Sequence, residues 1–157
     1  MPETKKELII YTDGSSRGNP GPGGYGAILI WGNTRKEISA GYRKTTNNRM
    51  ELMAVIASLE TLKKDNLSIS IYSDSSYVVN AIEKGWLNNW IKTNFKGGKK
   101  NRDLWTIYFH LSKKNNIKLN WVKGHADNPY NNRCDELATT AADGSHLLID
   151  EGYEAEN

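Results

Sequence analysis

Hydrophobic and polar positions alternate along several short stretches of the chain in a way that predicts strands. Leu67, Ile69 and Ile71 occupy every second position, as expected for a strand with one face in a core. The stretch around residues 25–31 is rich in isoleucine, leucine and aromatic residues, which also favours a strand. The predicted strands are Lys6–Thr12, Tyr25–Trp31, Glu37–Tyr42, Leu67–Tyr72 and Ile117–Val122.

Other stretches carry apolar residues at helical spacing. Within Asn48–Lys64, the residues Met50, Met53, Ala54 and Ala57 recur with that period and predict a helix with one buried face. The further predicted helices are Ser75–Glu83, Trp86–Asn94, Arg102–Lys113 and Asn131–Ala142.

The order of these elements predicts an α/β fold. The three leading strands are joined by short loops, so they should form an antiparallel meander. The two later strands are reached through helices and should lie parallel to the first strand. We therefore expect a five-stranded mixed β-sheet, three antiparallel strands and then two parallel ones, flanked by helices.

Chain length predicts a single folded unit. A chain of 157 residues is enough for one domain with a sizeable core and too short for two ordinary domains. We expect this domain to span residues 1–142. Residues 143–157, which carry Asp150, Glu151, Glu154 and Glu156, should form a loosely held acidic tail.

Composition narrows the class of protein. With 38% hydrophobic and 25% charged residues, the chain is typical of a folded protein rather than a disordered one. The longest apolar run, Leu52–Ala57, is too short to span a membrane, and the N-terminus lacks the pattern of a signal peptide. The single cysteine, Cys134, cannot form an internal disulfide, which suits a reducing cytosol. We expect a cytoplasmic protein that does not contact membranes.

The net charge of +3 is concentrated in one segment. Six basic residues and no acid lie between positions 84 and 102, interleaved with Trp86, Trp90 and Phe95. Such a segment can neutralise phosphates while its rings cover sugars or bases, as nucleic-acid surfaces do. The alternative is a solvated basic loop whose tryptophans anchor it to the core, and the segment alone favours that alternative.

Four carboxylates at the ends of predicted elements are the candidates for chemistry: Asp13, Glu51, Asp74 and Asp135. Each also has an ordinary explanation. Asp13 precedes a glycine and fits a turn, and Asp74 could cap the following helix. Glu51 and Asp135 fall in the first turn of their predicted helices, where the dipole favours negative charge. For each acid taken singly, the turn, cap or dipole explanation is better than a role in chemistry.

Helical spacing predicts that Glu51 and Asp135 face inward. The residues three, four and seven positions after each of them are mainly small or apolar, whereas the same spacing from Glu136 gives a polar stripe. Asp13 and Asp74 should end neighbouring parallel strands, where open α/β sheets place their sites. Four converging carboxylates repel one another unless cations lie among them. The pattern therefore indicates a divalent metal site and chemistry on phosphate.

Several segments, in a fixed order, match the pattern of one enzyme family: Tyr11–Ser15, Gly18–Gly26, Thr45–Leu52, Ser73–Ser75, Trp121–His125 and Asn132–Ala138. These segments resemble the type I ribonucleases H, and the resemblance covers roughly residues 7–142. It implies a ribonuclease H-like fold and hydrolysis of the RNA strand of RNA–DNA hybrids, leaving 3′-hydroxyl and 5′-phosphate ends. It further implies two Mg²⁺ ions in the substrate complex, with Mn²⁺ as a substitute, and removal of RNA primers and hybrids during replication and repair.

The resemblance also assigns roles to single residues. The four acids become the metal ligands, and His125 becomes a catalytic proton shuttle rather than a merely exposed loop histidine. The residues assigned to substrate binding are Asn19, Thr46, Asn47, Asn48, Ser76, Trp86, Trp90, Lys99, Lys100 and Asn101. Among them, the asparagines at positions 19, 47 and 48 would contact RNA hydroxyls, whereas Thr46 and Asn101 would hold DNA phosphates. Turn and cap chemistry explains each asparagine about equally well.

Some positions depart from the pattern of the best-known bacterial members. Ser76 stands where a longer amide side chain is common, Ser16 replaces a cysteine, and Gly85 is an insertion before Trp86. These departures affect fine substrate contacts and leave the acids intact. We expect a free-standing monomer with no obligate protein partner.

Three alternatives remain to be weighed. Gly21, Gly23 and Gly26 match a dinucleotide-binding fingerprint, but that motif must open a helix and Tyr25–Trp31 predicts a strand. Integrases and junction resolvases share the expected fold, yet the contexts of Glu51 and residues 123–125 are not expected in them. A hybrid-binding module without activity would gain nothing from four clustered acids facing phosphate.

Overall fold

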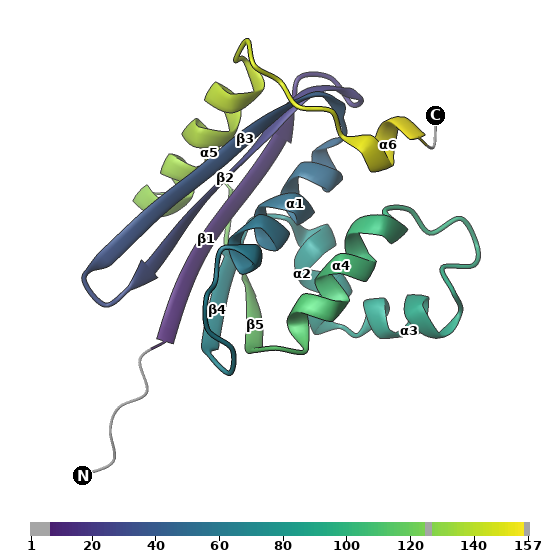
Figure 1. The fold of residues 1–157 in the computed structure, drawn as a ribbon, viewed down its shortest axis with the longest axis horizontal. Coiled ribbons are helices and arrows are strands. Elements are labelled where there is room, and N and C mark those ends of the chain that lie inside the picture. Colours follow the sequence, from purple (N-terminus) through teal and green to yellow (C-terminus); the bar gives the residue numbers. More distant parts are fainter. Residues whose placement is uncertain (1–6, 125–126, 156–157) are drawn as a thin grey trace.

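A five-stranded mixed β-sheet forms the centre of the molecule in the computed structural model (Figure 1). The structure describes residues 7–124 and 127–155. The strands are β1 (Glu7–Ser16), β2 (Gly21–Trp31), β3 (Thr34–Thr45), β4 (Ser68–Ser73) and β5 (Asn116–Trp121). Their order in the sheet is β3-β2-β1-β4-β5, with β1–β2 and β2–β3 antiparallel and β1–β4 and β4–β5 parallel. The predicted fold class is confirmed.

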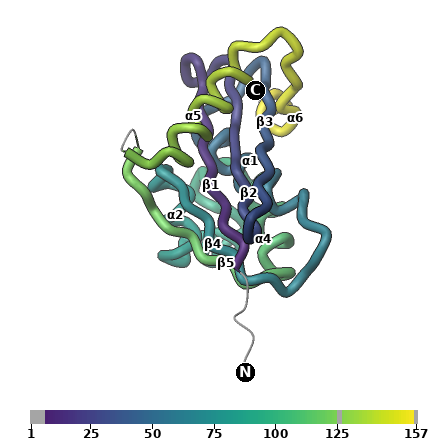
Figure 2. Tube along the Cα trace, turned by 90° about the vertical axis from the view of Figure 1, so that its left-hand side faces the viewer, coloured from purple at the N-terminus to yellow at the C-terminus, as the bar shows by residue number. Residues whose placement is uncertain are grey.

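Helices cover both faces of this sheet. The helices are α1 (Asn47–Glu60), α2 (Ser76–Glu83), α3 (Trp86–Lys92), α4 (Arg102–Ser112), α5 (Pro129–Ala142) and α6 (Glu151–Ala155). Helix α5 packs on β1, β2 and β3 from one side, whereas α1 packs on β1 and β2 from the other and carries α4 on its outer surface (Figures 1 and 2). Helix α2 lies beside β4 and β5 and contacts α3.

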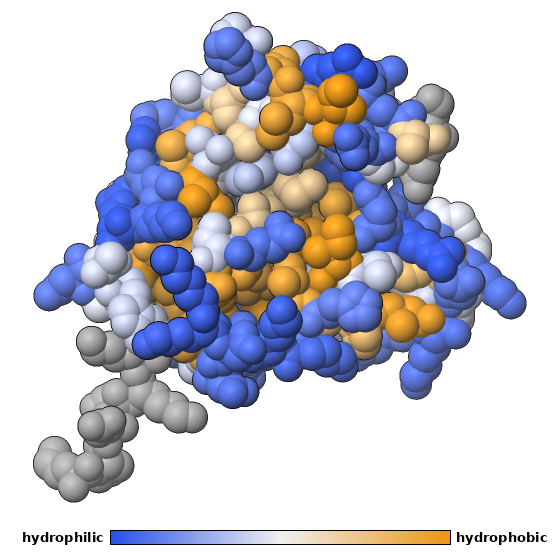
Figure 3. All heavy atoms as spheres, viewed as in Figure 1, coloured by the Kyte–Doolittle hydropathy of each residue, from blue (hydrophilic) through white to orange (hydrophobic). Residues whose placement is uncertain are grey.

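The main core lies between the sheet and the layer of α1, α2 and α4. Ile10 and Ile71 from neighbouring strands are fully buried there with Leu52 of α1 and Trp105 of α4. Alternation along β4 places Ile69 in the same core, as its period-2 pattern predicted. In Figure 3, apolar residues gather in the middle of the face shown and hydrophilic residues surround them.

Three of the strands are longer than the hydrophobic pattern predicted. β1 continues through Asp13 to Ser16 because Ser16 pairs with Gly23 of β2. β2 begins at Gly21 and β3 extends to Thr45 because these two residues also pair. The glycine-rich segment therefore forms ladder hydrogen bonds, which periodicity does not reveal. Because the glycines at positions 21, 23 and 26 lie within β2, they do not open a helix, and a dinucleotide-binding loop would require one.

Glycines in β2 and β3 allow α5 to approach the sheet closely. A Cβ atom on Gly26 would lie 2.5 Å from the carbonyl oxygen of Cys134, and one on Gly41 would lie 2.1 Å from that of Ala141. No side chain fits at these positions. The close approach brings the α5 helix, and with it Asp135, over the strand that carries Asp13.

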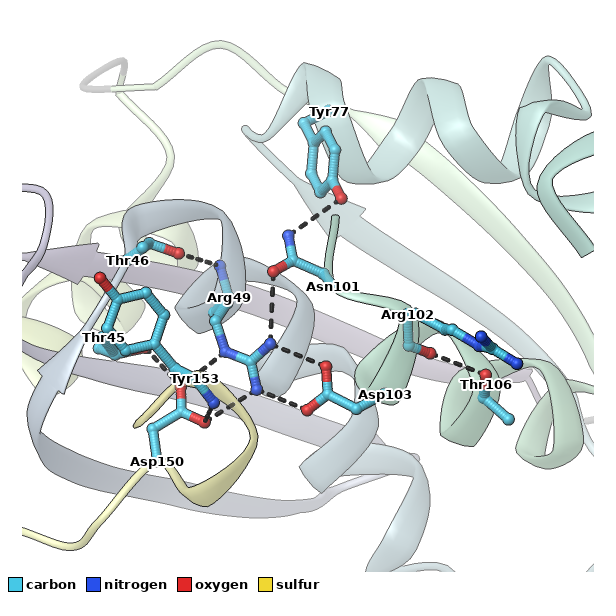
Figure 4. Close-up of polar contacts among 10 residues, drawn as sticks. All are labelled: Thr45, Thr46, Arg49, Tyr77, Asn101, Arg102, Asp103, Thr106, Asp150 and Tyr153. Atoms are coloured by element: carbon cyan, nitrogen blue, oxygen red, sulfur yellow. Dashed lines mark hydrogen bonds and ion pairs between the residues drawn. The ribbon is translucent and has the colours of Figure 1, made fainter. Parts of the chain in front are cut away.

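The C-terminal segment is docked rather than loosely held, so this expectation from the sequence is wrong. Leu148 exchanges backbone hydrogen bonds with Gly41 and Arg43 of β3, which extends the sheet edge. Asp150 is only 3% exposed, and its carboxylate pairs with Arg49 of α1 (Figure 4). The acidic segment is therefore held by a specific ion pair. Within the described ranges, no helix has the length and apolar character needed to cross a membrane.

Candidate metal and nucleic-acid site

The close contact between β1 and the start of α1 positions Asp13 and Glu51. A Cβ atom on Gly14 would lie 2.3 Å from the backbone carbon of Met50, so only glycine lets the strand and helix meet here. The Gly14 amide donates a hydrogen bond to Glu51 Oε1 at 2.5 Å and also contacts Asp13 Oδ1 at 2.9 Å. Asp13 and Glu51 are each 5% exposed. They are thus fixed side by side in a mostly buried position.

Asp74 joins them from the neighbouring strand. The parallel ladder of β1 and β4 ends at the pair Thr12 and Ser73, so the next residues, Asp13 within β1 and Asp74 directly after β4, lie at the same end of these neighbouring strands. Ser75, and not Asp74, caps α2, because its Oγ accepts the Val78 amide at 3.2 Å. The capping explanation for Asp74 is therefore wrong.

The three carboxylates form a compact group. Ligand oxygens of Asp13, Glu51 and Asp74 lie within 4.8 Å of one another. Burial, together with the charge of Asp74, raises the pKa of Asp13 to about 8. Burial and the charge of Asp13 raise the pKa of Glu51 well above its ordinary value. Without a cation, the group resists ionisation.

The chemistry of this group fits a hard divalent cation. Its donor atoms are all carboxylate oxygens, the ligands that Mg²⁺ and Mn²⁺ prefer in proteins. In the described part of the chain, the buried Oδ1 atom of Asp74 has no hydrogen-bond partner. A buried carboxylate oxygen normally accepts a hydrogen bond or binds a metal, so this atom is a free ligand position.

Asp135 lines the same cleft from α5 but lies outside the compact group. It is half-buried, and its charge contributes to the raised pKa of Asp13. α1 begins at Asn47 and α5 at Pro129, so neither Glu51 nor Asp135 is in a first helical turn. The helix-dipole explanation for both residues is therefore wrong.

The acids lie in a cleft of about 390 Å³, which we call the carboxylate cleft. The residues that line it are Asp13, Gly14, Ser15, Asn47, Asn48, Glu51, Asp74, Ser75, Ser76, Tyr77 and Asp135. Of the candidates for substrate binding, Asn47, Asn48 and Ser76 are therefore beside the acids. The side chain of Glu136 points away, being 66% exposed, as its polar stripe predicted.

A second cleft of about 620 Å³ adjoins the first and shares Asn48 and Tyr77 with it. We call it the lysine cleft. The residues that line it are Asn19, Pro20, Thr46, Asn48, Tyr77, Trp90, Gly98, Lys99, Lys100, Asn101 and Tyr153. It thus unites most of the candidates for substrate binding. It contains two cationic side chains and no acid among its lining residues.

The basic segment combines the two roles considered for it. Trp90 is 9% exposed and packs on Trp105 and Phe95, so it anchors the segment to the core. It also lines the lysine cleft, with the Lys99 ammonium 5.8 Å from its ring centroid. Trp86 is 42% exposed and lines neither cleft. His125 lies outside the described residues.

Tyr77 lines both clefts and was not among the sequence candidates. The available signal was its position three residues after Asp74, which places it in the first turn of α2, next to that acid in the chain. From the sequence, the segment Ser75–Glu83 was predicted only as a helix, with no role for Tyr77. The hydroxyl group of Tyr77 matters because it accepts hydrogen bonds from Asn101 and Trp105.

Comparisons with known proteins agree with this geometry. The family model described as RNase H matches residues 5–143. The chain belongs to the ribonuclease H family. A curated ribonuclease H of Desulforamulus reducens is 52% identical over 149 residues, covering 92% of this chain and 93% of the relative. One from Trichodesmium erythraeum is 46% identical and covers 98% of this chain and 100% of the relative.

Solved structures of ribonucleases H share the fold. LC9-RNase H1, a type 1 enzyme with the type 2 active-site motif, superposes with a TM-score of 0.81 at 27% identity, over 99% of this chain and 82% of that chain. LC11-RNase H1 in complex with an RNA/DNA hybrid gives a TM-score of 0.67 at 28% identity, covering 87% of this chain and 96% of that chain.

Proposed function

We propose that this chain is a metal-dependent endoribonuclease that hydrolyses the RNA strand of RNA–DNA hybrids. The observation that carries the proposal is the compact group of Asp13, Glu51 and Asp74 in the carboxylate cleft of a ribonuclease H family member. The hybrid-bound relative supports the substrate class. Hydrolysis adds water across the bond between phosphorus and the 3′ oxygen, which leaves 3′-hydroxyl and 5′-phosphate ends.

The four acids Asp13, Glu51, Asp74 and Asp135 would hold two Mg²⁺ ions, with Mn²⁺ as a substitute. When bound, the ions supply charge neutralisation at the phosphate and activation of water. The Gly14 amide holds the Glu51 carboxylate in position, so it need not reorganise when a ligand arrives. The unpartnered Oδ1 of Asp74 is available as a ligand atom without loss of a protein hydrogen bond.

His125 is proposed as a proton shuttle near the leaving group. Its chain neighbour Gly124 lies against Asp74, because a Cβ atom built on Gly124 would be 2.8 Å from Asp74 Oδ2. The segment that carries His125 therefore starts at the carboxylate cleft. A histidine titrates near neutral pH, which suits it to moving a proton during turnover.

Selection of RNA over DNA would rest on contacts to the 2′-hydroxyl groups. Asn47, Asn48 and Ser76 border the acids, and Asn19 stands next to them. Asn19 Oδ1 accepts a hydrogen bond from the backbone amide of Asn47 at 3.1 Å, which holds the Asn19 side chain beside the start of α1. These side chains are proposed to read the RNA strand beside the scissile phosphate.

The lysine cleft would receive the DNA strand. Thr46 and Asn101 are proposed to hold its phosphates, while Lys99 and Lys100 supply positive charge and Trp90 an apolar wall. Trp86, exposed on α3, would cover sugars or bases further along the duplex. We further propose that residues 1–142 carry the catalysis. The protein would act as a cytoplasmic monomer, without an obligate partner, on RNA primers and hybrids.

One assay tests this function. Labelled RNA–DNA hybrid, double-stranded RNA and double-stranded DNA are incubated with Mg²⁺ and either the native protein, Asp13→Asn or Glu136→Gln. The matched control changes an exposed acid on α5. Cleavage of RNA only in the hybrid, lost in Asp13→Asn and kept in Glu136→Gln, supports the proposal. Tight hybrid binding without cleavage by the native protein would instead show a binding module.

A further inference from the structure

The hydroxyl group of Tyr77 stands where the carboxylate cleft and the lysine cleft meet. Tyr77 lies on α2, is half-buried and lines both clefts. Its ring packs against Trp90 and Trp105, with ring centroids 6.5 and 5.8 Å away. The ring is therefore held in place by the core, and the position of its hydroxyl is set by packing.

A chain of hydrogen bonds fixes the polarity of this hydroxyl. A guanidinium group can only donate, so the Asn101 atom that lies 3.3 Å from Arg49 Nη1 is the amide oxygen. The Asn101 amide nitrogen then faces Tyr77 and donates to its oxygen at 3.1 Å (Figure 4). The indole nitrogen of Trp105, also a pure donor, gives the same oxygen a second hydrogen bond at 2.8 Å.

The Tyr77 oxygen accepts two hydrogen bonds and keeps its own hydrogen for a third partner. A phenol has one hydrogen to donate, and among residues 7–124 and 127–155 no acceptor for it is found. Accepting hydrogen bonds makes a hydroxyl a stronger donor, because the bonds in such a chain polarise one another. Tyr77 is thus a prepared donor at the junction of the clefts.

Arg49 holds the first member of this series of hydrogen bonds, Asn101, in a fixed position. The side chain of Arg49 is 2% exposed, and its guanidinium pairs with Asp103 on α4 and with Asp150 in the C-terminal segment. Two carboxylates compensate its charge, so its donors are directed into the protein and to Asn101. Arg49 and Asn101 therefore act as positioning residues for Tyr77.

We propose that Tyr77 donates a hydrogen bond to a backbone phosphate of the DNA strand, an inference that rests on the proposed function. The scissile RNA phosphate would lie among the acids of the carboxylate cleft. The two strands of a duplex run side by side, so the DNA strand passes over the adjoining lysine cleft. Lys99 and Lys100 attract its phosphates there, and Tyr77 faces the acceptor that stands nearest the RNA strand.

The first test compares Tyr77→Phe with Tyr108→Phe. Tyr108 belongs to the same aromatic cluster, 5.9 Å from the Trp105 ring, but lines neither cleft. Loss of a hydrogen bond to a charged phosphate should raise the KM for hybrid about tenfold in Tyr77→Phe, with kcat retained. Tyr108→Phe should keep the native KM. A merely structural role for Tyr77 would lower Tm and leave KM unchanged, which would overturn the proposal.

The second test locates the acceptor. Hybrids that each carry one uncharged methylphosphonate, at successive positions of the DNA strand or of the RNA strand, are bound to native protein and to Tyr77→Phe in Ca²⁺. At one position of the DNA strand, the methylphosphonate should weaken hybrid binding by the native protein about tenfold and leave hybrid binding by Tyr77→Phe nearly unchanged. The proposal would be overturned if the effects of the methylphosphonate and of Tyr77→Phe on binding were additive at every position. It would also be overturned if the two effects were coupled only at positions of the RNA strand. If the native protein cleaves no hybrid in Mg²⁺, the proposed function itself fails.

Discussion

Arg49 and Asp150 lie 101 residues apart in the chain and form a buried, two-pronged ion pair. Arg49 Nε donates to Asp150 Oδ2 at 2.7 Å, and Nη2 donates to Oδ1 at 2.8 Å. The same carboxylate accepts the Thr45 hydroxyl at 2.7 Å. The pair joins the C-terminal segment to α1, the helix that also carries Glu51, so it links the chain terminus to the catalytic layer.

Replacing Asp150 by Ala should lower the free energy of unfolding by about 3 kcal/mol, because it leaves Arg49 buried with one partner fewer. Urea denaturation followed by circular dichroism measures this change. The control is Glu154→Gln, at a position on the same C-terminal segment as Asp150. It removes an exposed ion pair with Arg43 of β3 and should change the free energy of unfolding by less than about 1 kcal/mol. Equal effects of the two substitutions would contradict the buried-pair account.

The metal-free protein should lose stability as the pH rises from about 4 toward about 8. The pKa of Asp13 is raised from 3.8 to about 8 in the folded state, so the folded protein binds more protons than the unfolded chain in this range. Stability is then highest below the unfolded pKa and falls as the pH rises through the folded one. Thermal unfolding in EDTA from pH 5 to pH 9 measures this dependence.

Asp13→Asn should flatten that pH dependence and raise the Tm of the metal-free protein at pH 8 by several degrees, because one repelling charge is removed. Added Mg²⁺ should raise the Tm of the native protein and have little effect on the variant. Glu136→Gln, an exposed acid, serves as the control and should behave as native. A native Tm that rises with pH in EDTA would contradict the repulsion among the acids.

Gly14→Ala should disable the site and destabilise the fold by about 2 kcal/mol, since the added methyl group would overlap the backbone of Met50 and force β1 away from α1. Hybrid cleavage and urea denaturation measure the two effects. Gly144→Ala is the control, because its Cβ atom would approach nothing closer than 3.2 Å. Native activity in Gly14→Ala would contradict the role of this contact in placing Glu51.

His125→Ala should lower kcat for hybrid by about a hundredfold and leave hybrid affinity within a factor of about two, as expected for a proton shuttle. Steady-state cleavage and equilibrium binding in Ca²⁺ separate the two quantities. His146→Ala, at an exposed position that lines neither cleft, is the control. Equal losses of turnover and affinity would contradict the shuttle role.

The order of elements and the mixed sheet followed from the hydrophobic pattern and the loop lengths. The alternation along β4 corresponds to one buried face of that strand, whereas α1 is buried against both the sheet and α4. Convergence of Asp13 and Asp74 followed from strand order, since parallel strands end at one edge. Strand ends within the glycine-rich segment did not follow, because Gly21 and Gly23 are held by pairing with distant residues. The roles assigned to the individual site residues stay predictions.

The docked C-terminal segment and the role of Tyr77 could not be read from the chain. In the sequence, nothing distinguishes Asp150 from the other acids of the polar C-terminal segment. Its ion pair with Arg49 forms only in the complete fold. Tyr77 fits the apolar face of a helix by spacing. Only the structure shows that Asn101 and Trp105 both donate hydrogen bonds to the Tyr77 oxygen, so that its hydroxyl hydrogen remains available to donate.

The most direct test of the account is the location of Mn²⁺ in crystals of the Asp135→Asn variant bound to an RNA–DNA hybrid, measured by anomalous diffraction. The account predicts manganese peaks in contact with carboxylate oxygens of Asp13, Glu51 and Asp74 and with a phosphate of the RNA strand. Hybrid bound in the clefts without manganese among these three acids would contradict it.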